Sequence, residues 1–243
     1  MSSDRGAVQA AASRTAVIAA LGSERATLAR LAAAASRWSV VQSGPGPERA
    51  AQCAKAAVAS GACALVSFGL AGGLATGVRA GTVILPRRVI MQRGAAFPVA
   101  ADWHARLATL AATFAVDFGD LLTVPAALGS PAAKSAAATA LAAVAVDMES
   151  AAIAAVAARA RVPFVALRVV VDTQADQLPT GAEEWIDDRG NTRGGAALAA
   201  IARPREWLAL WRLAQRYRQA NAVLRRLAQQ VASRGLLDAS GGA

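Results

Sequence analysis

The chain has 243 residues, of which 55% are hydrophobic, and a formal net charge of +10 at pH 7. This composition excludes a disordered chain, and no apolar run reaches the roughly 18 residues that a membrane-spanning helix needs. Eight arginines and two acids lie from Ile201 onward, so the rest of the chain is only mildly basic and does not favour a nucleic-acid partner. We expect a cytoplasmic protein.

Residues that commonly bind metals are scarce. Cys53 and Cys63 are too few for a disulfide framework and lack the spacing of metal ligands, and His104 is the only histidine. We therefore expect neither a histidine-based zinc site nor a Ser-His-Asp triad, and we predict no metal site.

Short apolar runs alternate with helical patterns along the chain. The runs predict strands at 15–21, 39–44, 64–68, 82–86, 120–124, 141–148 and 163–172, and the patterns predict helices at 24–35, 47–60, 102–114 and 150–160. Strands that are apolar throughout indicate burial on both faces, hence a mostly parallel or mixed sheet flanked by helices. The sequence thus predicts a three-layer α/β domain over 15–203, after a flexible tail at 1–14.

An extra amphipathic helix is predicted at 204–234, followed by a tail at 235–243. Its apolar residues recur mostly every three or four positions, and arginines crowd its other sides. Two interpretations stay open. The helix packs on the domain with its basic face in solvent, or it touches anionic lipid through arginine and tryptophan at the inner face of the membrane.

Acidic residues stand where two predicted strands end. Asp147 and Met148 close one strand, Glu149 begins the helix after it, and Asp172 closes the next strand. A parallel crossover would bring Glu149 and Asp172 to the same edge of the sheet, where α/β folds bind ligands. Burial would raise the pKa of Asp172 and suit it to general-acid catalysis. The alternative is that both acids only cap local structure.

A third acid and a glycine-rich segment belong to the same predicted edge. Glu24 follows the first strand, and FGLAGGL at 68–74 follows the third. Its glycines would let the backbone approach a ligand closely and donate N–H groups to phosphate or sugar oxygens. The segment does not match the dinucleotide-binding fingerprint G-x-G-x-x-G.

Four blocks, in order, resemble the nucleoside phosphorylase and nucleosidase superfamily, especially the methylthioadenosine/S-adenosylhomocysteine nucleosidases. They are AVIAALGSE (16–24), SGPG (43–46) with FGLAGGL, AVDMESAA (145–152), and PFVALRVVVDTQAD (163–176). The forms SFGLAGGL and VDMES look most like the branch associated with hopanoid biosynthesis, which acts on adenosylhopane. The resemblance implies a nucleoside phosphorylase-like fold, a homo-oligomer and no cofactor.

The resemblance also implies a role for each acid. Asp172 matches the aspartate that protonates the purine leaving group at N7. Met148 and Glu149 match the pair that holds the ribose, and Glu24 matches the acid that positions or activates the attacking water. Cleaving an N-glycosidic bond builds positive charge on the ribose and negative charge on the base, so carboxylates at the sugar and a proton donor at the base suit this reaction.

Departures from the family pattern leave the co-substrate open. Leu70 replaces a serine or threonine of the nucleosidases and the phosphate-binding serine of the phosphorylases, whereas Arg25 stands near the place of a phosphate-binding arginine. Gly69, Leu70 and Arg25 are therefore predicted to hold water or phosphate, with inorganic phosphate as an alternative co-substrate, and Gly72 and Gly73 to line the substrate. The aromatic residue that stacks on adenine in the nucleosidases is missing from 121–134.

These features predict an enzyme that releases adenine from a 5′-modified adenosine, namely the lipid-linked adenosylhopane, by phosphorolysis or hydrolysis. One alternative is a methylthioadenosine/S-adenosylhomocysteine nucleosidase. Another is a non-catalytic relative that only binds nucleosides.

Overall fold

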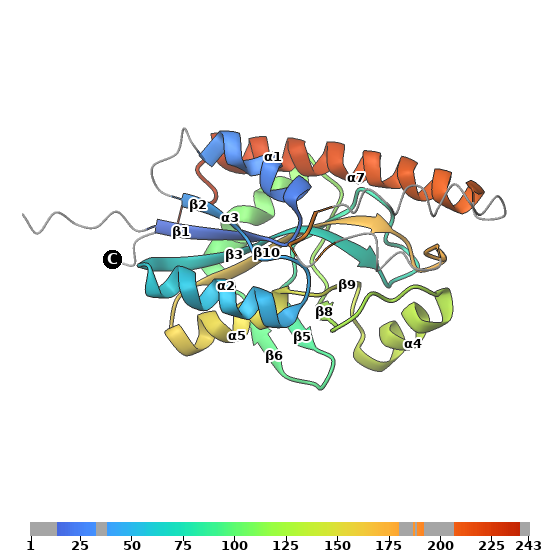
Figure 1. Cartoon of the computed structure of the whole chain (residues 1–243), viewed down its shortest axis with the longest axis horizontal. Helices are drawn as coiled ribbons and strands as arrows, with labels where there is room; N and C mark the ends of the chain where they lie inside the picture. Colours follow the sequence, from blue (N-terminus) through green and yellow to red (C-terminus); the bar gives the residue numbers. More distant parts are fainter. Residues whose placement is uncertain (1–13, 33–37, 180–186, 188, 192–206, 239–243) are drawn as a thin grey trace, which may run out of the picture.

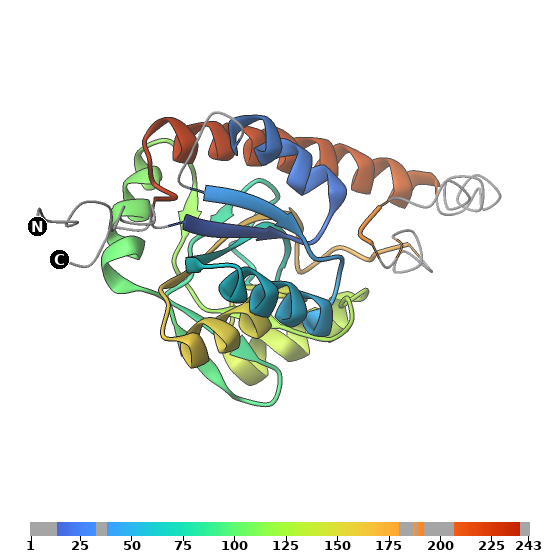
Figure 2. The ribbon, with the colours of Figure 1, turned by 60° about the vertical axis from the view of Figure 1, so that its left-hand side comes forward.

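A computed structural model of the protein describes residues 14–32, 38–179, 187, 189–191 and 207–238. A twisted sheet forms the middle of three layers (Figure 1). Helices α1 (Gly22–Ala32) and α7 (Trp207–Ser233) run side by side over one face, and α2 (Pro47–Ala59) and α5 (Ser150–Ala160) cover the other, as the turned view in Figure 2 also shows. The predicted three-layer α/β fold is confirmed.

The sheet is mixed, with ten strands. They are β1 (Arg14–Ala19), β2 (Trp38–Gln42), β3 (Ala62–Gly73), β4 (Val83–Ile84), β5 (Arg88–Met91), β6 (Ala96–Pro98), β7 (Val116–Asp117), β8 (Leu121–Thr123), β9 (Ala145–Asp147) and β10 (Phe164–Asp172). The strand path runs β6-β5-β8-β9-β3-β10-β4-β7, and β1 joins β2 to β3. The remaining helices are α3 (Ala101–Ala108), the 3₁₀ helix η1 (Thr109–Ala112) and α4 (Pro131–Leu141).

Strand β3 organises the sheet because it pairs with three other strands. One edge lies parallel to β10, in register from Leu65 to Gly72. The opposite edge pairs first with β1, as far as Ser67, and then with β9 at Gly72 and Gly73. Between Ser67 and Gly72 this edge has no partner among the described strands, so the sheet opens there.

Two apolar cores lie on either side of the sheet. The first joins Phe68 and Val169 of the central strands to Leu28 of α1 and Leu227 of α7, and the second packs α2 and α5 against the other face. Residues with special backbone conformations mark the start of α2 and the end of α5. Gly46, at φ 102°, and Pro47 begin α2, and Arg161 in the left-handed conformation ends α5.

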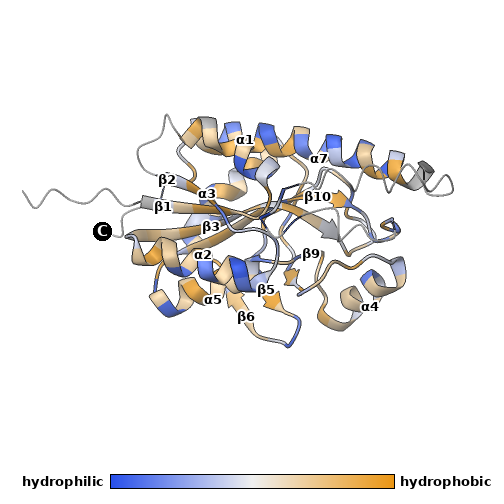
Figure 3. Cartoon of the chain, viewed as in Figure 1, coloured by the Kyte–Doolittle hydropathy of each residue, from blue (hydrophilic) through white to orange (hydrophobic). Residues whose placement is uncertain are grey.

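Helix α7 packs on the domain along its C-terminal half. Leu224, Leu227 and Val231 are fully buried, and hydrophilic and hydrophobic residues alternate along the ribbon of the helix (Figure 3). This packing supports the first interpretation made from the sequence for the C-terminal half of the helix, whereas most residues from Trp211 to Gln219 are exposed to solvent. Within the described residues, no helix has both the length and the apolar character needed to cross a membrane.

Several predicted elements differ from the structure. The glycine-rich segment is not a loop, because β3 continues as a strand to Gly73. The two strands joined by α5 are not parallel to each other, because β9 runs antiparallel to β3 whereas β10 runs parallel to β3. Residues 235–238 are not a free tail, because Leu237 is fully buried and the Trp103 Nε1–H donates to the carbonyl of Leu236 at 2.7 Å. Predicted residues 204–206 lie outside the described residues.

Candidate active site

The opening in the edge of β3 is filled by Glu24. Its Oε1 accepts the backbone N–H of Leu70 at 2.8 Å, and its Oε2 accepts those of Ala20 and Leu21 at 3.0 and 2.9 Å. The first turn of α1 thus places a buried carboxylate at the one stretch of this edge of β3 that no described strand covers. Burial raises the pKa of Glu24, against the lowering effects of Arg168 and these backbone hydrogen bonds.

Gly69 makes room for this arrangement. A Cβ atom at this position would lie 2.7 Å from Arg168 Nη1 and still closer to the Glu24 carboxylate. Real Cβ atoms do not approach other heavy atoms so closely, so any larger residue would displace one of the two charged groups. The glycine is required by this close packing and by its backbone φ of 157°, which other residues rarely adopt.

Arg168 lies at the centre of the site and is only 1% exposed. Its Nη2 contacts Asp147 Oδ2 at 2.8 Å and Glu149 Oε2 at 3.4 Å, and it donates to Ser67 Oγ at 2.7 Å. A buried guanidinium is tolerated only when its charge is paired and its N–H groups are used. Arg168 therefore lets two carboxylates lie together inside the protein.

Glu149 is held from two directions at the N-terminus of α5. Its Oε1 accepts the N–H of Gly46 at 3.0 Å, and its Oε2 faces Arg168. Burial raises the pKa of Glu149 to about 7, because the attraction of Arg168 only partly offsets desolvation and the repulsion of Asp147 and Glu24.

Asp147 has a structural position next to this acid. It accepts a hydrogen bond from Thr123 Oγ1 at 2.7 Å and from the backbone N–H of Ser150 at 3.2 Å, in addition to its ion pair with Arg168. All these partners belong to the protein interior. Asp147 thus fixes the start of α5 and the position of Arg168.

Asp172 lies at the end of β10, 5% exposed and paired with a different cation. Its Oδ2 forms an ion pair with Lys134 of α4, which is 1% exposed. Burial raises the pKa of Asp172, and Lys134 lowers it in part. Asp172 and Arg168 are four residues apart on one strand, which corresponds to about 13 Å along the chain. The acid at Asp172 is therefore separated from the Arg168 cluster.

The other predicted site residues are distributed as follows. Gly72 lies against Asp172, since a Cβ there would come 3.3 Å from Asp172 Oδ1, and Gly73 packs against the backbone carbonyl of the same residue. Met148 is half-buried between Asp147 and Glu149. Arg25 is exposed on α1, and no interaction in the described part of the chain joins its side chain to the cluster.

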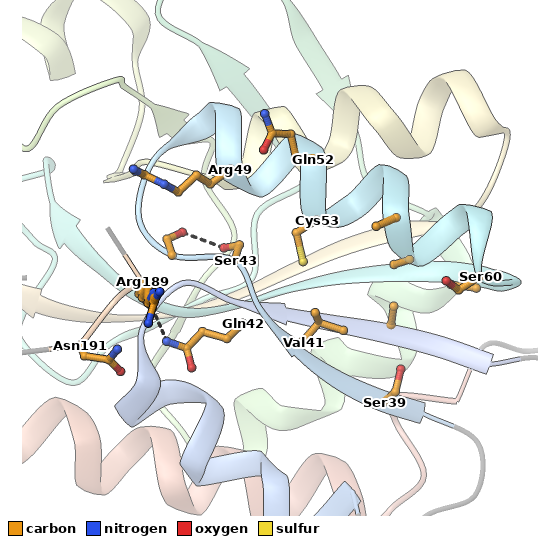
Figure 4. A pocket seen from close by; sticks show the side chains of 15 residues that line it. Ser39, Val41, Gln42, Ser43, Arg49, Gln52, Cys53, Ser60, Arg189 and Asn191 are labelled. Atoms are coloured by element: carbon orange, nitrogen blue, oxygen red, sulfur yellow. Dashed lines mark hydrogen bonds between the residues drawn. The ribbon is translucent and has the colours of Figure 1, made fainter. Parts of the chain in front are cut away.

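An open groove of about 870 Å³ lies beside the cluster, between β2 and α2 (Figure 4). Gln42, Ser43 and Arg189 lie at one end of it, and Ser39 and Ser60 at the other. None of the buried acids lines it. One chain segment nevertheless connects the groove with the site. Residues 43 and 44 line the groove, and the backbone N–H of Gly46, two residues later, donates to Glu149.

Arg168 and Lys134 belong to the site but are not among the residues predicted from the sequence. A signal existed for each: Arg168 is the only charged residue inside PFVALRVVV, and Lys134 is one of only two lysines in an arginine-rich chain. A lone cation inside a buried strand needs buried acids nearby. The acids had been identified, but the partners had not.

The arrangement provides one carboxyl suited to donate a proton and a separate cluster of carboxylates held by an arginine. No group of three or more metal-binding side chains occurs within the described ranges. Such a site can protonate a leaving group at Asp172 while stabilising positive charge near Glu149.

Comparison with known protein families gives one match. Residues 6–203 match the model described as the phosphorylase superfamily. No curated protein matches the chain in sequence.

Solved structures with the same fold include S-adenosylhomocysteine nucleosidases. The 5′-methylthioadenosine/S-adenosylhomocysteine nucleosidase of Neisseria meningitidis, solved with methylthio-immucillin-A, is 20% identical, with a TM-score of 0.68 over 91% of this chain and 99% of that one. The nucleosidase of Streptococcus pyogenes is 21% identical, with a TM-score of 0.61 over 68% and 86%. Futalosine hydrolase of Helicobacter pylori is 13% identical, with a TM-score of 0.66 over 90% and 98%. At these identities the likeness establishes the fold.

Proposed function

The chain belongs to the phosphorylase superfamily and is a nucleosidase or phosphorylase enzyme, and on this premise we propose that it hydrolyses the N-glycosidic bond of a 5′-modified adenosine and releases adenine. The observation that supports this most is the separation of Asp172 from the Glu24–Arg168–Glu149 cluster. One end of the site offers a proton, and the other offers negative charge.

In the proposed reaction Asp172 protonates the purine at N7. Its burial supports this role, because desolvation favours the protonated carboxyl. Glu149, with Met148 beside it, holds the ribose hydroxyls. As the bond to the base breaks, the positive charge that develops on the ribose is stabilised by the Glu149 carboxylate.

Glu24 supports water as the nucleophile. Its carboxylate already accepts the N–H of Leu70, which is the group that a phosphate bound to this segment would need. The carboxylate would also repel a phosphate dianion, and the Leu70 side chain adds no hydroxyl donor. We therefore propose that Glu24 and Arg168 position a water molecule, and that Arg25, which is exposed, does not bind phosphate.

The substrate we propose is adenosylhopane, in hopanoid biosynthesis. Support comes from the sequence forms SFGLAGGL and VDMES, from the leucine at position 70, and from the absence of a stacking aromatic at 121–134. A methylthioadenosine/S-adenosylhomocysteine nucleosidase is the second candidate, favoured by the family of the structural neighbours.

The test is a product analysis of adenosylhopane, methylthioadenosine and S-adenosylhomocysteine, each with and without phosphate. We expect adenine and free ribosylhopane in both conditions, and no adenine from the variant D172N. If a sugar 1-phosphate forms, and only when phosphate is present, the enzyme is a phosphorylase and the proposed hydrolysis is wrong. Binding without adenine release from any of the three would make the protein a non-catalytic relative.

We also propose that the protein is a homo-oligomer and that α7 contacts anionic membranes. The membrane contact is supported by Trp211, which is 61% exposed, beside the exposed arginines Arg212 and Arg218. Co-sedimentation with phosphatidylglycerol vesicles should fall in the variant W211A/R212Q/R218Q. Unchanged sedimentation would refute the contact, and analytical ultracentrifugation measures the oligomeric state.

A further inference from the structure

Lys134 is a buried cation whose contacts all lie at the base end of the site. Its Nζ donates to Asp172 Oδ2, to the carbonyl of Thr173 at 2.9 Å and to the carbonyl of Asp176 at 3.0 Å. These three acceptors use all three N–H groups of an ammonium. The proposed proton transfer, ribose binding and water attack give no role to Lys134.

The surroundings hold Lys134 in place. Asp176 Oδ2 accepts from the backbone N–H and the hydroxyl of Thr173, both at 2.7 Å, and forms an ion pair with Arg216 of α7. Among the described residues, the charged groups that face Asp172 are Lys134 from α4 and Arg216 from α7, and Asp176 pairs with the second. Lys134 is the cation that remains for Asp172.

We propose that Lys134 is a positioning residue that stabilises the Asp172 carboxylate left behind when the purine takes the proton, and that it thereby sets the upper pH limit of the enzyme. This inference rests on the proposed function. In the step concerned, the O–H bond of Asp172 breaks and the N7–H bond forms. The C1′–N9 bond breaks and its electron pair passes into the purine, so adenine leaves neutral. The water held at Glu24 forms the new C1′–O bond, and the proton that it releases to solvent balances the one that Asp172 takes back.

The physical reason is the low polarity around Asp172. A carboxylate formed in a buried place costs free energy, and an ammonium in contact with it offsets this cost more strongly than it would in water. Without Lys134 the carboxyl would hold its proton to higher pH and donate it less readily. The lysine offsets part of the desolvation that raises the pKa of this acid.

The experiment compares wild type with K134M, K134Q and K134R. In K134M we expect kcat for adenine release from adenosylhopane or methylthioadenosine to fall by about tenfold or more, with a smaller change in KM. The alkaline limb of the pH profile of kcat/KM should move to higher pH. K134R, which keeps the charge, should retain the wild-type limb, and K134Q, which keeps donors for the two carbonyls, serves if K134M does not fold.

A second measurement is independent of turnover. Carbon-13 NMR of labelled aspartate carboxyls, assigned with D172N, follows the Asp172 titration, which should move to higher pH in K134M or K134Q. An unchanged titration or an unchanged alkaline limb would overturn the inference. If the titration or the alkaline limb is unchanged but the wild type releases adenine, the inference about Lys134 fails and the proposed function stands. If the wild type releases no adenine, the proposed function is refuted, and the titration still tests the effect of Lys134 on Asp172.

Discussion

Replacing Glu149 by glutamine should change how the stability of the protein depends on pH. Burial raises the pKa of Glu149 from its ordinary value of 4.5 to about 7. Between these values the folded protein binds a proton that the unfolded chain has released, so the free energy of unfolding falls as pH rises. At about 1.4 kcal/mol per pH unit, this interval corresponds to a loss of about 3 kcal/mol in the wild type.

Glutamine resembles the protonated acid and cannot lose a proton. In E149Q the part of the pH dependence due to this side chain should disappear, and the difference in stability between pH 4.5 and pH 8 should shrink by about 3 kcal/mol. Comparing the two pH values within each variant cancels any fixed cost of placing the amide beside Arg168. Urea denaturation followed by circular dichroism gives the free energies of unfolding.

A control separates this effect from the loss of one negative charge. Glu48 is an exposed acid in the first turn of α2, and E48Q should keep the wild-type difference between the two pH values. If E149Q also keeps it, Glu149 does not carry a buried ionisable carboxyl and the electrostatic account of the site is wrong. Adenine release should be lost in E149Q at every pH, because the amide cannot supply negative charge to the ribose.

Two further substitutions test the packing around the site. G69A should reduce adenine release by about 100-fold or more, because the added Cβ would displace the Glu24 carboxylate or Arg168, whereas G77A, at an exposed glycine with no atom within 4 Å of the added Cβ, should retain it. Equal kinetics for the two variants would argue against the close packing at Gly69. L227A, on the buried side of α7, should lower the free energy of unfolding by about 2–5 kcal/mol. W211A, on the exposed side, should change it by less than about 0.5 kcal/mol, and urea denaturation distinguishes the two.

The central elements of the fold could be predicted because their sequences carry strong local signals. The run PFVALRVVVD produces β10, and SAAIAAVAARA produces α5 over the predicted residues. Strand β7 is not among the predicted strands; it is two residues long, and it forms by pairing with β4. No periodicity can be recognised in so short a segment, and the direction of β9 is likewise decided by its pairing with β3.

The acids of the site could be predicted from their positions at strand ends, and the cations could not. Asp172 follows an apolar run directly, and Glu24 and Glu149 each come three positions after the end of one. Lys134 comes from α4, an alanine-rich helix with no site signature, and reaches Asp172 across 38 positions in the chain. Such a pair is determined by tertiary packing. Only the rule that a buried charge needs a partner would have suggested it.

The two buried cations give the two ends of the proposed site different properties. Arg168 is shared by Asp147 and Glu149, so the sugar end can hold negative charge, although Glu149 loses its proton only near neutral pH in the free protein. The positive charge that develops on the ribose would favour the carboxylate further. At the base end Asp172 pairs with one lysine, and burial raises the pKa of its carboxyl, which favours the protonated form that the proposed proton transfer needs. A carboxyl group thus serves as a carboxylate at the sugar end and as a proton donor at the base end, because Glu149 and Asp172 have different buried partners.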